Sequence, residues 1–131
     1  GLTYGTYSTF AAGLGAGPWK AAITVNPANT ETALGAMRQE IDHFLKGGIT
    51  ADELAFAKSA FIGQQAQGLA TNGGMAGSLS NIEFYGLGLD YWSRYPQLIQ
   101  GVTLEQANEA ARKLIAPDRA HTVIVGPYQD K

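Results

Sequence analysis

Two stretches with alternating side chains decide the fold class: LTYGTYSTF at residues 2–10 and WKAAITVN at residues 19–26. β-Branched and aromatic residues favour extended backbone, and successive side chains of a strand point to opposite faces. One face of the first strand is expected to carry Leu2, Tyr4, Thr6, Ser8 and Phe10. Because a short glycine-rich link joins the two stretches, they predict an antiparallel β-hairpin.

After the hairpin, the apolar residues change to the three- and four-residue spacing of helices. The first helix is expected through Leu34, Met37, Ile41, Phe44 and Leu45, with Gly47-Gly48 ending it. Thr50-Ala51-Asp52-Glu53 and Thr103-Leu104-Glu105-Gln106 each match a capping box, in which the first and fourth side chains bind each other's backbone amides. Each box predicts the start of a helix, and residues 72–85 predict one more.

Asp90 is expected to cap a fourth helix, and Pro96 predicts a break or a new first turn there, because proline lacks the backbone N–H. Residues 121–125 predict a short strand, and residues 128–131 the start of a linker. Two strands, a block of helices and one strand predict an α+β fold, an antiparallel sheet with helices packed on one face. We expect residues 1–131 to form a single domain.

The composition excludes several classes of function. The chain has 131 residues, a net charge of −2 and no cysteine, so it has no disulfide and no thiolate metal site. Basic residues cluster no further than Arg112-Lys113, which argues against nucleic-acid binding. No apolar run approaches the roughly 18–20 residues of a membrane-spanning helix. We therefore expect neither a nucleic-acid partner nor a membrane span.

No catalytic or metal-binding pattern can be read from the chain. His43 and His121 are far apart in the sequence, and neither lies in an H-E-x-x-H or H-x-x-E-H motif. His43 is expected on the polar face of a helix, and His121 at the exposed start of a strand. The sequence therefore predicts no catalytic residue and no metal ligand. Packing, rather than base stacking, is expected for the aromatic residues Phe84, Tyr85, Tyr91, Trp92 and Tyr95.

Several short segments, in order, resemble the C-terminal half of pitrilysin/insulinase-type zinc metallopeptidases, which include the processing peptidases. They are Gly1-Leu2-Thr3-Tyr4 before Tyr7-Ser8-Thr9-Phe10; Gly17-Pro18-Trp19; Thr50-x-x-Glu53-Leu54-x-x-Ala57-Lys58; Phe84-Tyr85-Gly86-Leu87; Leu89-Asp90-Tyr91; Tyr95-Pro96; Val102-Thr103; and Val123-Ile124-Val125-Gly126-Pro127. The resemblance spans essentially the whole chain. It implies the half-domain fold of this family, without the family's first strand and helix of this half, which are expected before Gly1.

The resemblance also implies a proteolytic mechanism divided between two domains. In the family, an N-terminal domain binds Zn²⁺ through H-x-x-E-H and a further Glu, and the Glu inside the motif acts as general base. The C-terminal domain contributes an Arg–Tyr pair that binds the substrate carbonyl. The tyrosine falls on Tyr4, our one expected substrate-binding residue, and its arginine is expected before Gly1. This chain is expected to hold no cofactor and to be inactive alone.

One alternative from another functional class stays open. Family members without zinc ligands serve as structural or regulatory subunits. In both cases the expected partner is an N-terminal zinc-binding domain or a partner subunit of the same family, and the enzyme would also bind a peptide substrate. Phe84-Tyr85-Gly86-Leu87 resembles bacterial members and favours the bacterial periplasm or cell envelope. Without its first strand, the sheet would expose an edge that favours self-association.

Overall fold

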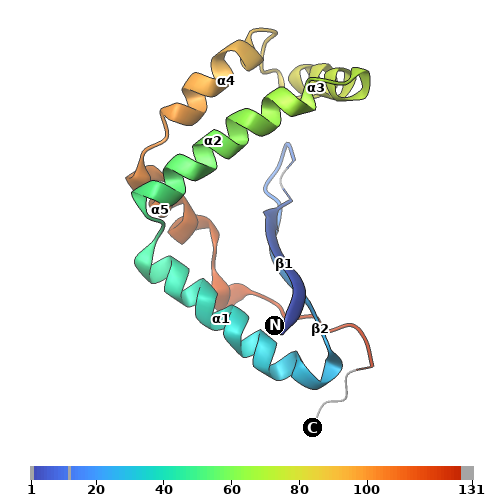
Figure 1. The fold of residues 1–131 in the computed structure, drawn as a ribbon, viewed down its shortest axis with the longest axis vertical. Coiled ribbons are helices and arrows are strands. Elements are labelled where there is room, and N and C mark those ends of the chain that lie inside the picture. The colour runs from blue at the N-terminus through green and yellow to red at the C-terminus, as the bar shows by residue number, and fades with distance from the viewer. Residues whose placement is uncertain (1, 12, 128–131) are drawn as a thin grey trace. The chain divides into compact units, whose positions relative to one another are not determined.

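The computed structural model describes residues 2–11 and 13–127, which contain two strands and five α-helices (Figure 1). The linker predicted for residues 128–131 lies outside the described residues. Backbone contacts divide the chain into two compact units, one of Gly1–Gly48 with Asn108–Lys131 and one of Ile49–Ala107. Each unit is described below by itself. The α+β fold class is confirmed, whereas the single domain over residues 1–131 stays a prediction.

Strands β1 (Thr3–Phe10) and β2 (Trp19–Val25) form the antiparallel hairpin that the sequence predicts. The register pairs Thr6 with Ile23 and Phe10 with Trp19. Side chains of directly paired residues lie on the same face of a sheet. The hairpin therefore presents its apolar β2 residues on one face together with alternate β1 residues.

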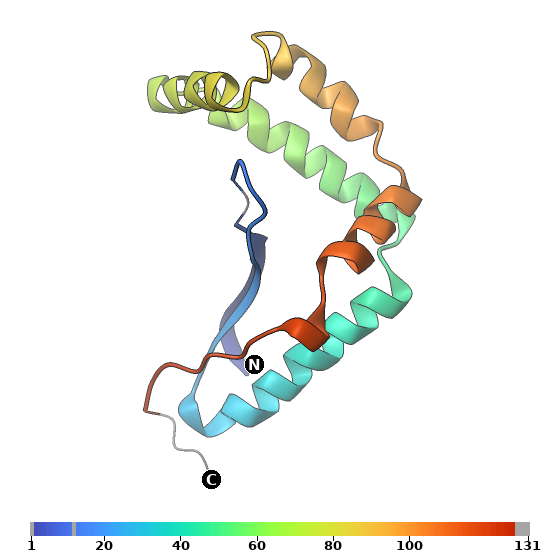
Figure 2. The same ribbon diagram turned by 180° about the vertical axis from the view of Figure 1, so that it is seen from behind.

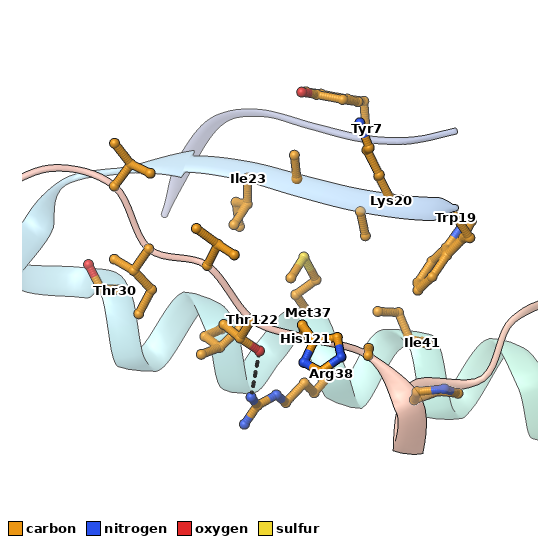
Figure 3. Close-up of a pocket in the computed structure, with 18 of the residues that line it drawn as sticks. Tyr7, Trp19, Lys20, Ile23, Thr30, Met37, Arg38, Ile41, His121 and Thr122 are labelled. Carbon is orange, nitrogen blue, oxygen red and sulfur yellow. Dashed lines mark hydrogen bonds between the residues drawn. The ribbon is translucent and has the colours of Figure 1, made fainter. Parts of the chain in front are cut away.

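Helix α1 (Thr30–Gly47) follows a short 3-10 turn, η1 (Pro27–Asn29), and packs against β2. Trp19 and Ile23 of β2 point toward Met37 and Ile41 of α1 (Figure 3). The helix ends where the two glycines predict. Gly48 adopts a φ of 71°, which favours glycine, and its amide donates to the Phe44 carbonyl at 2.7 Å.

Capping boxes begin two of the remaining helices, as predicted. The helices are α2 (Ala51–Gly68), α3 (Asn72–Tyr85), α4 (Tyr91–Gln100) and α5 (Leu104–Leu114). At α2 the Thr50 amide donates to Glu53 Oε2 at 2.7 Å, and the Glu53 amide donates to Thr50 Oγ1 at 3.2 Å. Thr103 and Gln106 make the same reciprocal pair before α5. Local hydrogen bonds therefore determine where both helices begin.

Helix α4 contradicts the break expected at Pro96, because it continues from Tyr91 to Gln100 with the proline inside. Pro96 has no N–H to offer the carbonyl of Trp92, four residues earlier. Gln65 of α2 instead donates its Nε2 to that carbonyl at 3.3 Å. A side chain from a neighbouring helix thus replaces the missing backbone bond, so the helix need not end.

Asp90 stands at the N-cap position of α4 as expected, but its side chain makes no capping hydrogen bond. Its carboxylate instead pairs with Arg94, with the Nε and Oδ2 atoms 2.7 Å apart. Both side chains are largely exposed, and exposed pairs at this spacing contribute little to stability. Arg94 also donates to the Leu87 carbonyl at 3.1 Å, so it ties the start of α4 to the preceding turn.

The prediction of a strand at residues 121–125, all of which the structure describes, is wrong. After the 3-10 turn η2 (Pro117–Arg119) no strand is formed, and residues 121–125 make no backbone hydrogen bond to a described residue. A β-branched sequence supplies the propensity of a strand but not the neighbour it needs. In the ribbon diagram this segment continues from η2 as irregular chain (Figure 2). It is held instead by Arg38 of α1, whose Nη2 donates to Thr122 Oγ1 at 3.1 Å (Figure 3).

We expect the Gln65 side chain to stabilise the second unit, because Pro96 leaves the Trp92 carbonyl without a helical donor and Gln65 supplies one. Gln65→Met should lower the free energy of unfolding by about 1 kcal/mol, since the Trp92 carbonyl loses its donor. In a Pro96→Ala background the alanine N–H can serve that carbonyl, so the same substitution should cost markedly less. Denaturant unfolding of the four proteins measures this coupling, and equal costs in both backgrounds would contradict it.

The capping box of α2 should make stability depend on pH. The pKa of Glu53 is lowered from 4.5, first by the hydrogen bond from the Thr50 backbone and then by that from its hydroxyl. A lowered folded-state pKa adds stability above the unfolded pKa, and that stability is lost as the pH falls through the folded pKa. The advantage of the wild type over Glu53→Gln should therefore be present at about pH 7 and disappear by about pH 3.

Chemical unfolding at several pH values measures this difference. The control is Glu109→Gln, which changes an exposed carboxylate in the middle of α5 rather than at a cap. An advantage over Glu53→Gln that does not change with pH would show that the carboxylate charge does not contribute to the cap.

Candidate functional site

Tyr4, the one substrate-binding residue expected from the sequence, lies on a β-bulge of β1. Thr3 pairs with Val25 and Gly5 already pairs with Thr24, so Tyr4 is an extra residue with no partner opposite it. A bulge shifts the alternation of faces by one residue and redirects a side chain. The direction of the Tyr4 side chain therefore does not follow from the alternation of the other β1 residues.

The bulge corrects the expectation that Tyr4 shares a face with Thr6 and Ser8. The register places Thr3, Thr6 and Ser8 opposite Val25, Ile23 and Ala21 of β2, on the face toward α1, and leaves Tyr4 outside this set. Thr3 takes the place on this face that simple alternation assigns to Tyr4. The side chain of Tyr4 is 98% exposed, so it does not pack as a half-buried strand residue would.

Thr3 holds the backbone on both sides of Tyr4 through its side-chain hydroxyl. The Oγ1 atom accepts a hydrogen bond from the Gly5 amide at 3.0 Å. Its proton can be donated to the Thr24 carbonyl at 2.8 Å or to the Gly5 carbonyl at 2.9 Å. The hydroxyl thus binds polar backbone groups of both strands beside the irregular pairing.

The arrangement leaves the phenol of Tyr4 available to a ligand. Within the described residues its hydroxyl makes no hydrogen bond. A phenol can donate one hydrogen bond and accept others, so it can bind the carbonyl oxygen of a peptide. Tyr7, which is 66% exposed, lies on the face of the hairpin away from α1 (Figure 3).

The sequence contains one signal for the bulge that the alternation argument did not use. A glycine inside a strand often marks a bulge, and Gly5 directly follows Tyr4. The partner of the Thr3 hydroxyl could not be found in this way. Thr24 lies on the other strand, and the contact depends on the register that the hairpin adopts.

The described residues do not form a zinc site. His43 on α1 and His121 are both exposed. Among the described residues, no group of three or more His, Cys, Asp or Glu side chains comes together in a way that could hold a metal ion. Neither histidine therefore has the companions that a zinc site requires. The same residues include no helix that is long and apolar enough to cross a membrane.

Two grooves in the first unit expose apolar side chains. One of 590 Å³ lies between the hairpin and α1, where Ile23, Met37 and Phe44 line it. A second, of 1330 Å³, lies between β2 and residues 114–127 and exposes Val123 and Val125 (Figure 3). Such surfaces are typical of sites that another segment covers. The expected self-association nevertheless stays a prediction.

Of the five aromatic residues expected to pack, the three of α4 pack against one another. Phe84 and Tyr85 contact each other edge to face but are exposed. Tyr91, Trp92 and Tyr95 form a cluster whose ring centroids lie 4.9 to 5.9 Å apart in edge-to-face arrangements. Burial, and to a lesser degree Tyr91, raises the pKa of Tyr95. All three rings are half-buried, so they stabilise the helix rather than offer a stacking surface.

Comparison with known proteins agrees with the resemblance. Residues 1–61 match the family model of the peptidase M16 inactive domain. The fold is similar to a crystal structure of a peptidase M16 inactive domain from Pseudomonas fluorescens, with 30% sequence identity over 88% of this chain and a TM-score of 0.76. The chain spans 27% of the length of that protein. No curated protein matches. In sequence over residues 1–61, and in fold over 88% of its length, the chain is therefore similar to inactive domains of the peptidase M16 family, which supports the resemblance to the C-terminal, zinc-free half of these proteins.

Proposed function

We propose that this domain helps a zinc metalloendopeptidase of the M16 family to bind its peptide substrate, across from a zinc site on another domain or subunit. The observation that carries the proposal is the fully exposed phenol of Tyr4 on an anchored bulge. Because the matching domains are described as inactive, a division between a binding domain and a catalytic partner is consistent with the family.

In this role, Tyr4 donates a hydrogen bond to the carbonyl oxygen of the peptide bond that is cleaved. When water attacks that carbonyl, negative charge develops on the oxygen. A donor already held in position stabilises this charge more than it stabilises the ground state, and so it raises kcat. The zinc of the partner would supply the activated water when bound, and nothing in the described part of this chain holds it.

The catalytic partner and the bacterial origin belong to the same proposal. The solved relative is almost four times as long as the matched segment, which leaves room for a further domain in that protein. Its source, Pseudomonas fluorescens, agrees with the bacterial character expected from Phe84-Tyr85-Gly86-Leu87. A periplasmic or cell-envelope location remains an expectation from the sequence.

Tyr4→Phe should lower kcat for peptide hydrolysis by roughly 10²–10³, with a small effect on KM, when the domain is assayed with its zinc-binding partner. Unfolding should be almost unchanged, since the residue is exposed. The matched control is Tyr7→Phe, a second exposed tyrosine of β1, which should change kcat little.

Steady-state kinetics with a fluorogenic peptide separates the outcomes. An unchanged kcat in Tyr4→Phe would remove Tyr4 from the site. If the assembled protein shows no zinc-dependent cleavage of any peptide, the domain is a structural or regulatory subunit instead.

The isolated domain should bind no stoichiometric zinc, because His43 and His121 have no companion ligands in the described structure. Dialysis against zinc followed by elemental analysis measures the bound metal. One tightly bound zinc per chain, lost in His43→Ala or His121→Ala, would contradict this expectation.

A further inference from the structure

We propose that Thr3 is a positioning residue: its hydroxyl holds the bulge that turns Tyr4 toward the substrate. The inference rests on the proposed role of Tyr4 and adds a residue that does not itself touch the substrate. It follows from the Thr3 hydrogen bonds and from the register between β1 and β2.

The Thr3 hydroxyl connects the two positions between which the extra residue is inserted. On its own strand it accepts from the Gly5 amide at 3.0 Å, just beyond Tyr4. On the opposite strand it reaches the Thr24 carbonyl at 2.8 Å, and Thr24 is the partner of Gly5. One side chain therefore fixes the backbone before and after Tyr4 to the same point of β2.

The alternative register shows what the hydroxyl prevents. Without the bulge, regular pairing would place Tyr4 opposite Val25, because Gly5 is already opposite Thr24. Tyr4 would then lie on the face of Thr6 and Ser8, which line the groove against α1. A shift of one residue moves a side chain to the other face of a sheet. The phenol would then point to the groove against α1 instead of away from this face.

No other described side chain performs this task. The other serine and threonine residues of β1 are Thr6, Ser8 and Thr9, and each lies in the regular part of the ladder. Thr9 pairs with Lys20, and its side chain makes no hydrogen bond to any residue described here. Thr9 is thus a matched control for threonine substitutions on this strand.

The test compares hydroxyl-free and hydroxyl-bearing residues at position 3 in the domain assembled with its zinc-binding partner. Thr3→Val keeps the shape and the strand propensity of threonine but loses the hydrogen bonds. We expect kcat to fall about tenfold with KM almost unchanged, a part of the loss expected for removal of one donor. Thr3→Ser should restore kcat, and Thr9→Val should leave it unchanged.

A double-mutant cycle with Tyr4→Phe shows whether Thr3 acts through Tyr4. We expect Thr3→Val to have no further effect on kcat once the phenol is absent. A similar fall in both backgrounds would overturn the positioning role. An unchanged kcat in Thr3→Val, while Tyr4→Phe is impaired, would overturn it as well and leave the proposed function intact.

An unchanged kcat in Tyr4→Phe would overturn the proposed function itself, and the inference with it. Circular dichroism confirms that each variant is folded. If Thr3→Val does not fold, Thr3→Ala provides the same loss of the hydroxyl without added bulk. Normal kcat in that variant would equally overturn the inference.

Discussion

The register between β1 and β2 is the constraint on which the rest of the first unit depends. From Phe10 to Gly5 the two strands pair without interruption, and the pairing sends Trp19 and Ile23 toward α1. At Tyr4 the pairing takes one extra residue and resumes with Thr3. The regular part of the pairing therefore directs β2 side chains toward α1, and its irregular end carries the exposed phenol of Tyr4.

Much of the fold could be predicted from the sequence because the responsible interactions are local. The capping boxes at Thr50 and Thr103 involve residues three positions apart, and both are present in the structure. The predictions that are wrong concern elements whose structure depends on a residue distant in the sequence. Pro96 does not break α4 because Gln65 supplies a donor from another helix. Residues 121–125 have strand propensity, but no described neighbour pairs with them.

In the candidate site, too, the sequence predicts what depends on neighbouring residues and not what depends on a distant contact. The family resemblance identifies Tyr4 by its place in a short motif, but only the structure shows that the residue lies on a bulge and is exposed. Period-two alternation assumes an unbroken ladder, and it placed Tyr4 with Thr6 and Ser8, which the structure shows on the face toward α1. The contact that alters this direction joins Thr3 to Thr24, which are 21 positions apart. No local pattern contains that information.

A bulge is a suitable support for a group that must bind a developing charge. A donor contributes to catalysis only to the extent that it is held in place before the reaction. Residues on strands are held more rigidly than residues on loops, but regular strands present every second side chain to the face that packs. Inserting one residue into β1 keeps the backbone of the strand and takes one side chain out of the alternation of faces. Tyr4 can therefore be both fully exposed and anchored, because the hydrogen bonds that fix it are made by its neighbour Thr3.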